Sequence, residues 1–246
     1  SIISNEGFMI ELRDVVVAYD TRVILDSVNL TIKDGETLVI LGGSGSGKST
    51  LLRLIIGLQR PTSGQIIVDG VDITTLSEEE FNKVRQKMGM VFQYSALFDS
   101  MSVGENVAFG LREHTNLSDD KIQHIVDERL GWVGLSGYES YMPNELSGGM
   151  KKRVSLARAI ALDPTLILYD EPSSGLDPIT SGTISMLIRG MQERLGCTSI
   201  VVTHDMQSAF YVADRIALLD KGKFIEVSKT EDFKNSPNPK VQQFIH

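Results

Sequence analysis

One stretch decides the fold of this 246-residue chain: Gly42-Gly43-Ser44-Gly45-Ser46-Gly47-Lys48-Ser49-Thr50. It fits the pattern G-x-x-x-x-G-K-[ST], and it lies between an apolar run at residues 37–41 and a predicted helix at residues 48–57. Glycines let the backbone wrap closely around an anion, with successive N–H groups pointing inward beside the positive end of a helix. In this pattern Lys48 reaches the β- and γ-phosphates of a nucleotide and the Ser49 hydroxyl binds Mg²⁺. The sequence therefore predicts a strand, a phosphate loop (residues 42–50) and a helix.

Two adjacent carboxylates follow a second apolar run. Residues 166–169 read Leu-Ile-Leu-Tyr and lead directly into Asp170 and Glu171. Ligands bind at the carboxyl ends of parallel strands, and adjacent strand residues point in opposite directions. We therefore expect Asp170 to face Mg²⁺ beside the phosphate loop, and Glu171 to orient or deprotonate the water that attacks the γ-phosphate. A solvated strand end would also explain two carboxylates, but the phosphate loop favours the catalytic interpretation.

Apolar runs alternate with amphipathic segments along most of the chain. Ser77 and Glu80 have the spacing of a capping box, and Asp177 before Pro178 is typical of a helix start. Strands are predicted at residues 10–19, 28–32, 37–41, 65–68, 89–92, 166–169, 199–203, 215–219 and 224–227.

Between residues 94 and 163 the strand signals disappear, and helices are predicted at 118–131 and 149–162. The fold class is therefore α/β: a P-loop NTPase with a RecA-like parallel-sheet core, an antiparallel β layer from the N-terminal strands, and an inserted α-helical lobe. We expect one domain over residues 1–246. Its core lobe spans about 1–93 and 164–246, and its helical lobe spans about 94–163.

Composition excludes several classes of protein. With 24 Lys and Arg against 32 Asp and Glu, the net charge of −8 argues against general affinity for DNA, RNA or anionic lipid. No apolar run approaches the roughly 18 residues that a membrane-spanning helix needs. Residues 1–8 lack the basic and long apolar segments of a secretory signal, and the single cysteine, Cys197, cannot form an internal disulfide. We expect a cytoplasmic protein with no nucleic-acid partner.

A further stretch, Leu146-Ser147-Gly148-Gly149-Met150-Lys151-Lys152-Arg153, resembles the signature of ATP-binding-cassette ATPases, which usually has Gln where this chain has Met150. Gln93 lies 45 residues after Lys48, at the position of the family's Q-loop. His204 lies 33 residues after Glu171 and resembles the switch histidine. Residues 174–177, Ser-Gly-Leu-Asp, resemble the D-loop. Tyr19, which lies 29 residues before Lys48, matches the aromatic residue that stacks on adenine.

This resemblance implies an ATPase that uses ATP and Mg²⁺ and acts as a homodimer. Because Ser147, Gly148 and Gly149 precede a helix, they form a second phosphate-binding nest, so one chain carries two half-sites. In the family, ATP on the phosphate loop of one copy is capped by the signature of the other. The implied catalytic residues are Glu171, His204 and Gln93; the implied metal ligands are Ser49, Gln93 and Asp170; the implied ATP contacts are Tyr19, residues 42–50, Ser147, Gly148, Gly149 and Asp177.

A narrower resemblance points to the ATPases of Mla-type transporters, which move phospholipids with MCE proteins. It rests on residues 92–98 (Phe-Gln-Tyr-Ser-Ala-Leu-Phe), residues 111–115 (Leu-Arg-Glu-His-Thr), Met150, and residues 177–180 (Asp-Pro-Ile-Thr). It implies that ATP hydrolysis to ADP and phosphate drives lipid transport through separate integral membrane permease subunits. The implied additional partners are an MCE substrate-binding protein and a small regulatory subunit. The implied location is the cytoplasmic face of the inner membrane, where the chain would be held peripherally through the permease.

Two alternatives stay open. One is a cassette ATPase without a membrane partner that acts on DNA or ribosomes. Chromosome-type cassettes carry a long coiled coil between the phosphate loop and the signature, whereas Lys48 and Ser147 are only 99 positions apart here and sustained heptads are missing. The other is a transporter ATPase that serves a different cargo, such as amino acids or metals.

Several weaker features have two interpretations. Leu97, Phe98 and Met101 belong either to the core of the helical lobe or to the groove that receives a membrane subunit. Lys151 and Lys152 are expected on a solvated helix face, while Arg153 is a candidate to support phosphate geometry. Packing in the helical lobe is expected for Trp132 and Tyr138, and surface positions are expected for His114, His124 and His246.

Overall fold

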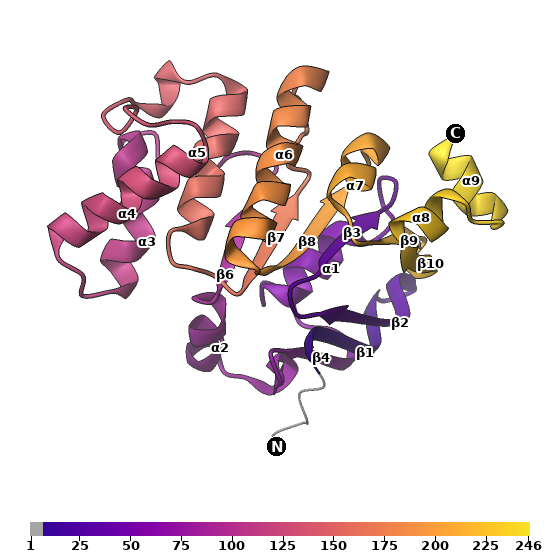
Figure 1. The fold of residues 1–246 in the computed structure, drawn as a ribbon. Helices are drawn as coiled ribbons and strands as arrows, with labels where there is room; N and C mark the ends of the chain where they lie inside the picture. Colours follow the sequence, from indigo (N-terminus) through magenta and orange to yellow (C-terminus); the bar gives the residue numbers. More distant parts are fainter. Residues whose placement is uncertain (1–6) are drawn as a thin grey trace.

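The computed structural model describes residues 7–246, which form two β-sheets and surrounding helices (Figure 1). The N-terminal stretch that was expected to lack a signal lies mostly outside the described residues. The smaller sheet is antiparallel and has the order β2-β1-β4-β5. Its strands are β1 (Phe8–Tyr19), β2 (Arg22–Lys33), β4 (Ser63–Val68) and β5 (Val71–Asp72).

The larger sheet has the order β10-β9-β3-β8-β7-β6, and its strands are parallel except for β10, which pairs antiparallel with β9. The predicted α/β class, with a parallel core and an antiparallel layer, is confirmed. The strands of this sheet are β3 (Thr37–Leu41), β6 (Met88–Val91), β7 (Leu166–Asp170), β8 (Thr198–Thr203), β9 (Arg215–Asp220) and β10 (Lys223–Lys229).

Strand β2 begins six residues before its predicted start at residue 28. Ser27 has a positive φ, and the register between β1 and β2 shifts between Val15 and Val17. Such an irregularity interrupts the two-residue alternation of buried side chains, which is the signal that predicts a strand. The strand continues through it, because Leu25 pairs with Val17 and is fully buried.

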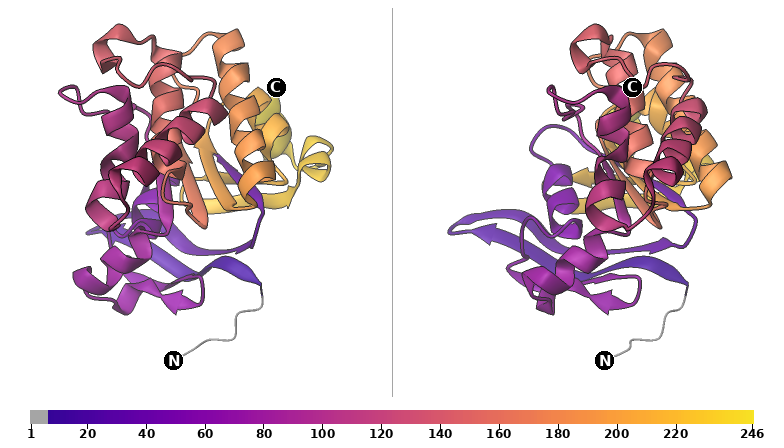
Figure 2. Two further views of the ribbon diagram at one scale, coloured as in Figure 1. Left: turned by 60° about the vertical axis from the view of Figure 1, so that its left-hand side comes forward. Right: turned by 90° about the vertical axis from the view of Figure 1, so that its left-hand side faces the viewer.

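Strand β3 contributes side chains to both halves of the core. Leu38 and Ile40 pack between the two sheets and against α1. Val39 and Leu41 pack on the opposite face, beneath the helices. In Figure 2 the indigo and purple smaller sheet forms one layer, and the magenta to orange helices lie on the other side of the parallel sheet. A parallel strand buried on both faces reads as a continuous apolar run, and residues 37–41 have that pattern.

The two helix starts that the sequence predicts from capping residues are confirmed. Ser77 and Glu80 form a complete capping box at α2, and Asp177 caps α6 with Pro178 in the first turn. The predicted helices at 118–131 and 149–162 are α4 and α5. The helices are α1 (Lys48–Ile55), α2 (Glu78–Arg85), α3 (Val103–His114), α4 (Asp119–Trp132), α5 (Gly148–Ile160), α6 (Pro178–Leu195), α7 (Met206–Val212), α8 (Thr230–Lys234) and α9 (Pro239–Ile245), with short 3₁₀ turns at Ile73–Thr75 and Pro143–Glu145.

Helices α3, α4 and α5 gather at one end of the molecule, on the left of Figure 1. Trp132 in α4 lies between two guanidinium groups: that of Arg129 is 4.2 Å from the centre of its ring, and that of Arg194 in α6 is 4.6 Å away. The cation–π contact with Arg194 joins this end of the molecule to α6.

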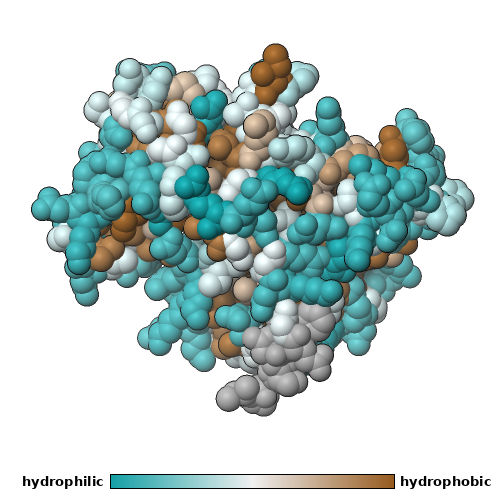
Figure 3. Space-filling model, in the orientation of Figure 1, coloured by the Kyte–Doolittle hydropathy of each residue, from teal (hydrophilic) through white to brown (hydrophobic). Residues whose placement is uncertain are grey.

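The face in Figure 3 is mostly hydrophilic, with hydrophobic residues scattered singly or in small groups. Among the described residues, no helix is long and apolar enough to cross a bilayer.

Asn106 of α3 fixes the loop that follows β6. It is 0% exposed, and its side-chain amide donates to the backbone oxygens of Phe98, Met101 and Ser102, while its Oδ1 accepts from the Phe98 amide at 2.8 Å. The loop therefore has two sides. Leu97 packs against the core, whereas Phe98 is 42% exposed.

Replacing Asn106 with Ala should destabilise the fold by about 1–3 kcal/mol, because several buried backbone groups would lose their partner. Urea unfolding monitored by circular dichroism measures this change. Asn116→Ala, in an exposed loop, is the matched control and should stay within about 0.5 kcal/mol of the parent. Equal unfolding midpoints for the two variants would contradict this role of Asn106.

Candidate active site

The ends of three neighbouring parallel strands bring the predicted site together. Leu41 at the end of β3 lies beside Thr203 at the end of β8, and Asp170 at the end of β7 lies beside Val202. The residues that follow these strands therefore emerge at one edge of the sheet. They are Gly42, His204 and Glu171, each of which the sequence placed in the site.

The phosphate loop turns sharply into α1. Gly47 caps this helix with a φ of 105°, and a Cβ at this position would lie 2.8 Å from a methyl group of Leu25. At Gly42 a Cβ would lie 2.4 Å from the Ser46 hydroxyl. Gly47 is therefore required both by its backbone conformation and because a side chain would not fit, and Gly42 is required because a side chain would not fit. Ser46 is itself buried, and its hydroxyl has no hydrogen-bond partner among the described residues.

The loop borders an open cleft of about 680 Å³. Of the predicted site residues, those from Gly43 to Thr50 line it together with Gln93, Glu171 and His204. Arg22, Ile24 and Arg53 also line the cleft and were missed from the sequence. The position of Arg53 could have been predicted, because it lies four residues after Ser49 on α1 and hence one helical turn away on the same face.

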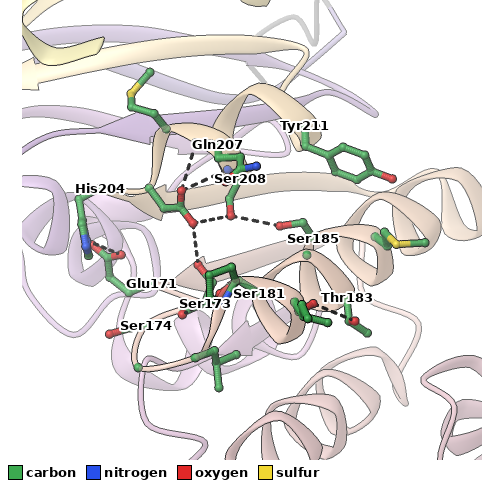
Figure 4. A pocket seen from close by; sticks show the side chains of 18 residues that line it. Glu171, Ser173, Ser174, Ser181, Thr183, Ser185, His204, Gln207, Ser208 and Tyr211 are labelled. Carbon is green, nitrogen blue, oxygen red and sulfur yellow. Dashed lines mark hydrogen bonds and ion pairs between the residues drawn. The ribbon is translucent and has the colours of Figure 1, made fainter. Parts of the chain in front are cut away.

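Glu171 is the centre of the charged network. One carboxylate oxygen accepts from Lys48 Nζ at 2.9 Å, and the other lies 3.0 Å from His204 Nδ1. Burial alone would raise the pKa of Glu171, but the hydrogen bonds and positive charges of Lys48 and His204 outweigh burial and hold this pKa below its usual value. The carboxylate is therefore charged at neutral pH, and the paired side chains of Glu171 and His204 are visible in Figure 4.

Asp170 occupies a different environment from its neighbour. Its side chain is half-buried, and burial together with the adjacent Glu171 raises its pKa, against the effect of Lys48 and Lys152. A cation close to this carboxylate would favour its charged form. The Ser49 hydroxyl, the Asp170 carboxylate and the Gln93 amide oxygen are the hard oxygen donors that Mg²⁺ prefers, so the donor set fits this ion. Gln93 also donates from Nε2 to the Ser174 hydroxyl at 3.3 Å.

Other predicted residues lie away from the residues that line the cleft. Tyr19 is exposed at the end of β1, and its hydroxyl accepts a hydrogen bond from Gln59. Asp177 accepts hydrogen bonds from Thr180 at the start of α6. The signature residues Ser147, Gly148 and Gly149 begin α5, where the Ser147 hydroxyl accepts from the Met150 amide at 3.2 Å. One chain therefore holds the phosphate loop and the signature as two separate surfaces.

The predicted surface position of Lys152 is wrong. This lysine is 5% exposed, and its Nζ donates to the backbone oxygens of Phe92 and Gln93. Burial lowers its pKa, an effect that the charge of Asp170 opposes. Arg153 points toward Gly134, with its Nη1 3.6 Å from where a Cβ of that residue would be, and it is absent from the lining of the cleft. His114, His124 and His246 are exposed, as predicted.

A second, larger cavity of about 940 Å³ adjoins the first, and Glu171 and His204 border both. Figure 4 shows the side chains that line this second cavity. It runs between α6 and α7. Hydroxyl groups from both helices line it, and Ser185 donates to Ser208 at 3.2 Å. Asp205 accepts from Ser208 at 2.7 Å and from Ser173 at 3.4 Å, which links the start of α7 to the segment after Glu171.

Comparison with known proteins identifies this arrangement. Residues 25–174 match the family model described as "ABC transporter". Over 96% of its length the chain is 46% identical to the intermembrane phospholipid transport system ATP-binding protein MlaF of Haemophilus influenzae, of which the match covers 90%. The chain belongs to the ABC transporter family. The resemblance in its motifs is thus confirmed, and the chain is an ABC ATPase that binds ATP.

Two further similarities describe the breadth of this ABC family. The chain is 42% identical over 99% of its length to the probable ribonucleotide transport ATP-binding protein mkl of Mycobacterium bovis, and the match covers 69% of that protein. Among solved structures, it resembles the ATP-binding cassette MJ0796, determined as a dimer in a post-hydrolysis state with ADP and Pi. That match has a TM-score of 0.83 and 36% identity, and it covers 90% of this chain and 99% of the other.

Lys48→Ala should weaken ATP binding by about 10- to 100-fold, because a charge-assisted contact to phosphate contributes about 1.5–3 kcal/mol. Titration with a fluorescent ATP analogue measures the change. Lys83→Ala, which removes an exposed lysine from α2, is the control and should bind as the parent does. Parental affinity in Lys48→Ala would exclude the phosphate loop as the nucleotide site.

Proposed function

We propose that this ABC ATPase drives phospholipid transport through a separate membrane permease, in the manner of Mla-type systems. The proposal rests on the position of the Glu171 carboxylate, which Lys48 and His204 hold at the edge of the cleft beside the phosphate loop. The chain that carries this site is 46% identical to MlaF. The relative mkl carries a different cargo in its name, ribonucleotides, so the cargo is the part of the proposal that needs its own test.

Within the site, Lys48 is the group that first meets the nucleotide. Its ammonium group is neutralised by Glu171, and both side chains are nearly buried. The phosphates of ATP offer Lys48 a more highly charged partner than one carboxylate. ATP binding would therefore free one oxygen of Glu171, while His204 keeps its contact with the other. Glu171 can then accept a hydrogen bond from the water that attacks the γ-phosphate, and the remaining contact with His204 continues to favour the charged form that a base requires.

Mg²⁺, when bound, neutralises charge on the β- and γ-phosphates during transfer. We assign its protein ligands to Ser49, Asp170 and Gln93. The Ser49 hydroxyl lies in the first turn of α1, Asp170 ends β7, and Gln93 reaches the cleft from the loop after β6. The remaining roles follow the family: Tyr19 stacks on adenine, and Asp177 lies near the nucleotide of the opposing copy.

The signature needs a second copy of the chain. Ser147 and Gly148 are exposed at the start of α5, and neither lines the cleft of its own chain. The amide groups at a helix start bind phosphate well, so this end of α5 is suited to cap an ATP held elsewhere. A dimer in which each signature faces the phosphate loop of the other copy uses both surfaces. The cassette MJ0796, solved as a dimer with ADP and Pi, supports the pairing of two copies.

The two parts of the chain would then have separate tasks. We assign a nucleotide-binding core lobe to about residues 1–93 and 164–246, of which the structure describes 7–93 and 164–246, and a helical lobe that presents the signature to about residues 94–163. Tyr94 is 80% exposed and Phe98 is exposed nearby, so the loop after Gln93 offers an apolar surface to a permease. We place the chain at the cytoplasmic face of the inner membrane, peripheral through that permease, with an MCE protein and a small regulatory subunit as further partners.

Cargo is tested with the transporter assembled from this chain and its native membrane subunits. In proteoliposomes that contain a fluorescent phospholipid, Mg-ATP should drive phospholipid transfer, and Glu171→Gln should abolish it. Mass spectrometry of the purified complex should find bound phospholipid. ATP-dependent movement of ribonucleotides or amino acids without lipid transfer would reject the lipid proposal and leave the ATPase assignment intact.

Glu171→Gln should keep ATP affinity and lose roughly 10²- to 10⁴-fold in turnover, because it removes the base but preserves the shape of the side chain. Persistent ATP should then stabilise a dimer, which sedimentation with and without Mg-ATP detects. Adding Ser147→Arg should dissolve this dimer by placing bulk and charge in the shared site. Two results would contradict the two-site mechanism. One is a Glu171→Gln chain that stays monomeric with Mg-ATP at high concentration and does not pair with a second copy in the assembled transporter. The other is ATP hydrolysis by this variant at the parental rate.

A further inference from the structure

Two cations of α5 hold the backbone of the loop that carries Gln93. Lys152 Nζ donates to the backbone oxygens of Phe92, at 3.0 Å, and of Gln93. Arg158 continues the contact farther along the loop and donates to the oxygens of Ser95, at 2.9 Å, and Ala96, at 2.8 Å. Four of five successive carbonyl groups, from residues 92 to 96, are thus bound by one helix.

Lys152 is unusual among these contacts because its charge is buried. The side chain is 5% exposed, and the oxygens that it contacts belong to neutral peptide groups. Burying an ammonium group costs free energy unless its hydrogen atoms are satisfied. An apolar side chain could fill the same space without this cost, but it could not donate to two carbonyl groups. Filling the core is therefore a poor explanation for a lysine here.

The contacts of Lys152 connect α5 to the cleft through Gln93. The Gln93 side chain lines the cleft beside Lys48 and Glu171, while the Gln93 carbonyl group is held by Lys152. Lys152 is also five residues from Ser147, at the start of the same helix. A rigid helix therefore connects the signature, which serves the nucleotide of the opposing copy, to Gln93 in the cleft of its own chain.

We propose that Lys152 is a positioning residue that ties Gln93 to α5, so that each nucleotide site senses the signature contact made by its own chain. This inference rests on the proposed two-site dimer. When the signature engages ATP on the second copy, α5 and the loop at residues 92–96 move as one body. Gln93 would then be in position to hold Mg²⁺ only when the signature of the same chain is engaged.

The test compares Lys152→Met with Lys151→Met. Methionine has nearly the length of lysine but no N–H donor. Lys151 is the adjacent residue on α5, is only partly buried, and lies outside the site, so the control makes the same chemical change one position away. Lys152→Arg, which keeps a cationic donor, tests for rescue. The measurements are hydrogen exchange of the backbone amides at residues 92–96, Mg-ATP affinity, turnover of the assembled transporter, and the unfolding midpoint.

Lys152→Met should raise hydrogen exchange in the loop and lower turnover by about 10- to 100-fold, the effect expected when a site residue is misplaced by about 1 Å. Mg-ATP affinity should change less than about threefold, because the phosphate loop is untouched. Lys151→Met should match the parent, and Lys152→Arg should recover a measurable part of turnover. These results would not arise from a lower unfolding midpoint alone, which would change exchange throughout the sheet.

Loop exchange and turnover in Lys152→Met equal to those of Lys151→Met would overturn the proposal. So would a loss of turnover accompanied by uniform exchange across the chain, since that pattern indicates general destabilisation. Failure of the proposed two-site dimer looks different. In that case the Glu171→Gln chain would stay monomeric with Mg-ATP, while loop exchange would still report whether Lys152 holds Gln93.

Discussion

The alignment of three parallel strand ends is the constraint on which the site depends. Pairing of β3 with β8, and of β8 with β7, places Gly42, His204 and Glu171 at one edge of the sheet, although they are far apart in sequence. A slip of one residue in either pairing would turn the side chains of a strand to the opposite face. The apolar residues of β3, which pack against different cores on its two faces, oppose such a slip. The catalytic geometry is therefore a consequence of core packing.

Charge balance at this edge then determines how the site responds to nucleotide. A phosphate-binding lysine in a partly buried cleft needs an anion, and Glu171 supplies one. The same contact lowers the pKa of this carboxylate. Phosphate and carboxylate compete for one cation, so nucleotide binding changes the partners of the residue that we propose as the base. Lys152 connects α5 to the site as well, because it couples the loop of Gln93 to this helix, which begins with the signature.

Local patterns predicted much of this structure, and long-range contacts account for what they missed. The phosphate loop, the acidic pair after β7 and the caps of α2 and α6 depend on residues close in sequence, so the sequence was sufficient for them. Arg22 lines the cleft from the first position of β2, although it lies 26 residues before Lys48, and Lys152 is buried by a loop about 60 residues away. From the sequence alone, a lysine on an amphipathic helix is predicted to be exposed, because the distant segment that covers it cannot be identified. The irregularity at Ser27 likewise hid the first residues of β2.

The proposed mechanism depends on ATP being shared between the phosphate loop of one copy and the signature of another. The most direct test is a structure of the Glu171→Gln chain with Mg-ATP, in its assembled transporter. A shared site predicts two ATP molecules, each between Lys48 of one copy and Ser147 of its partner, with Gln93 of the first copy at the metal. ATP bound to the phosphate loop with the signature of the partner facing solvent would contradict it.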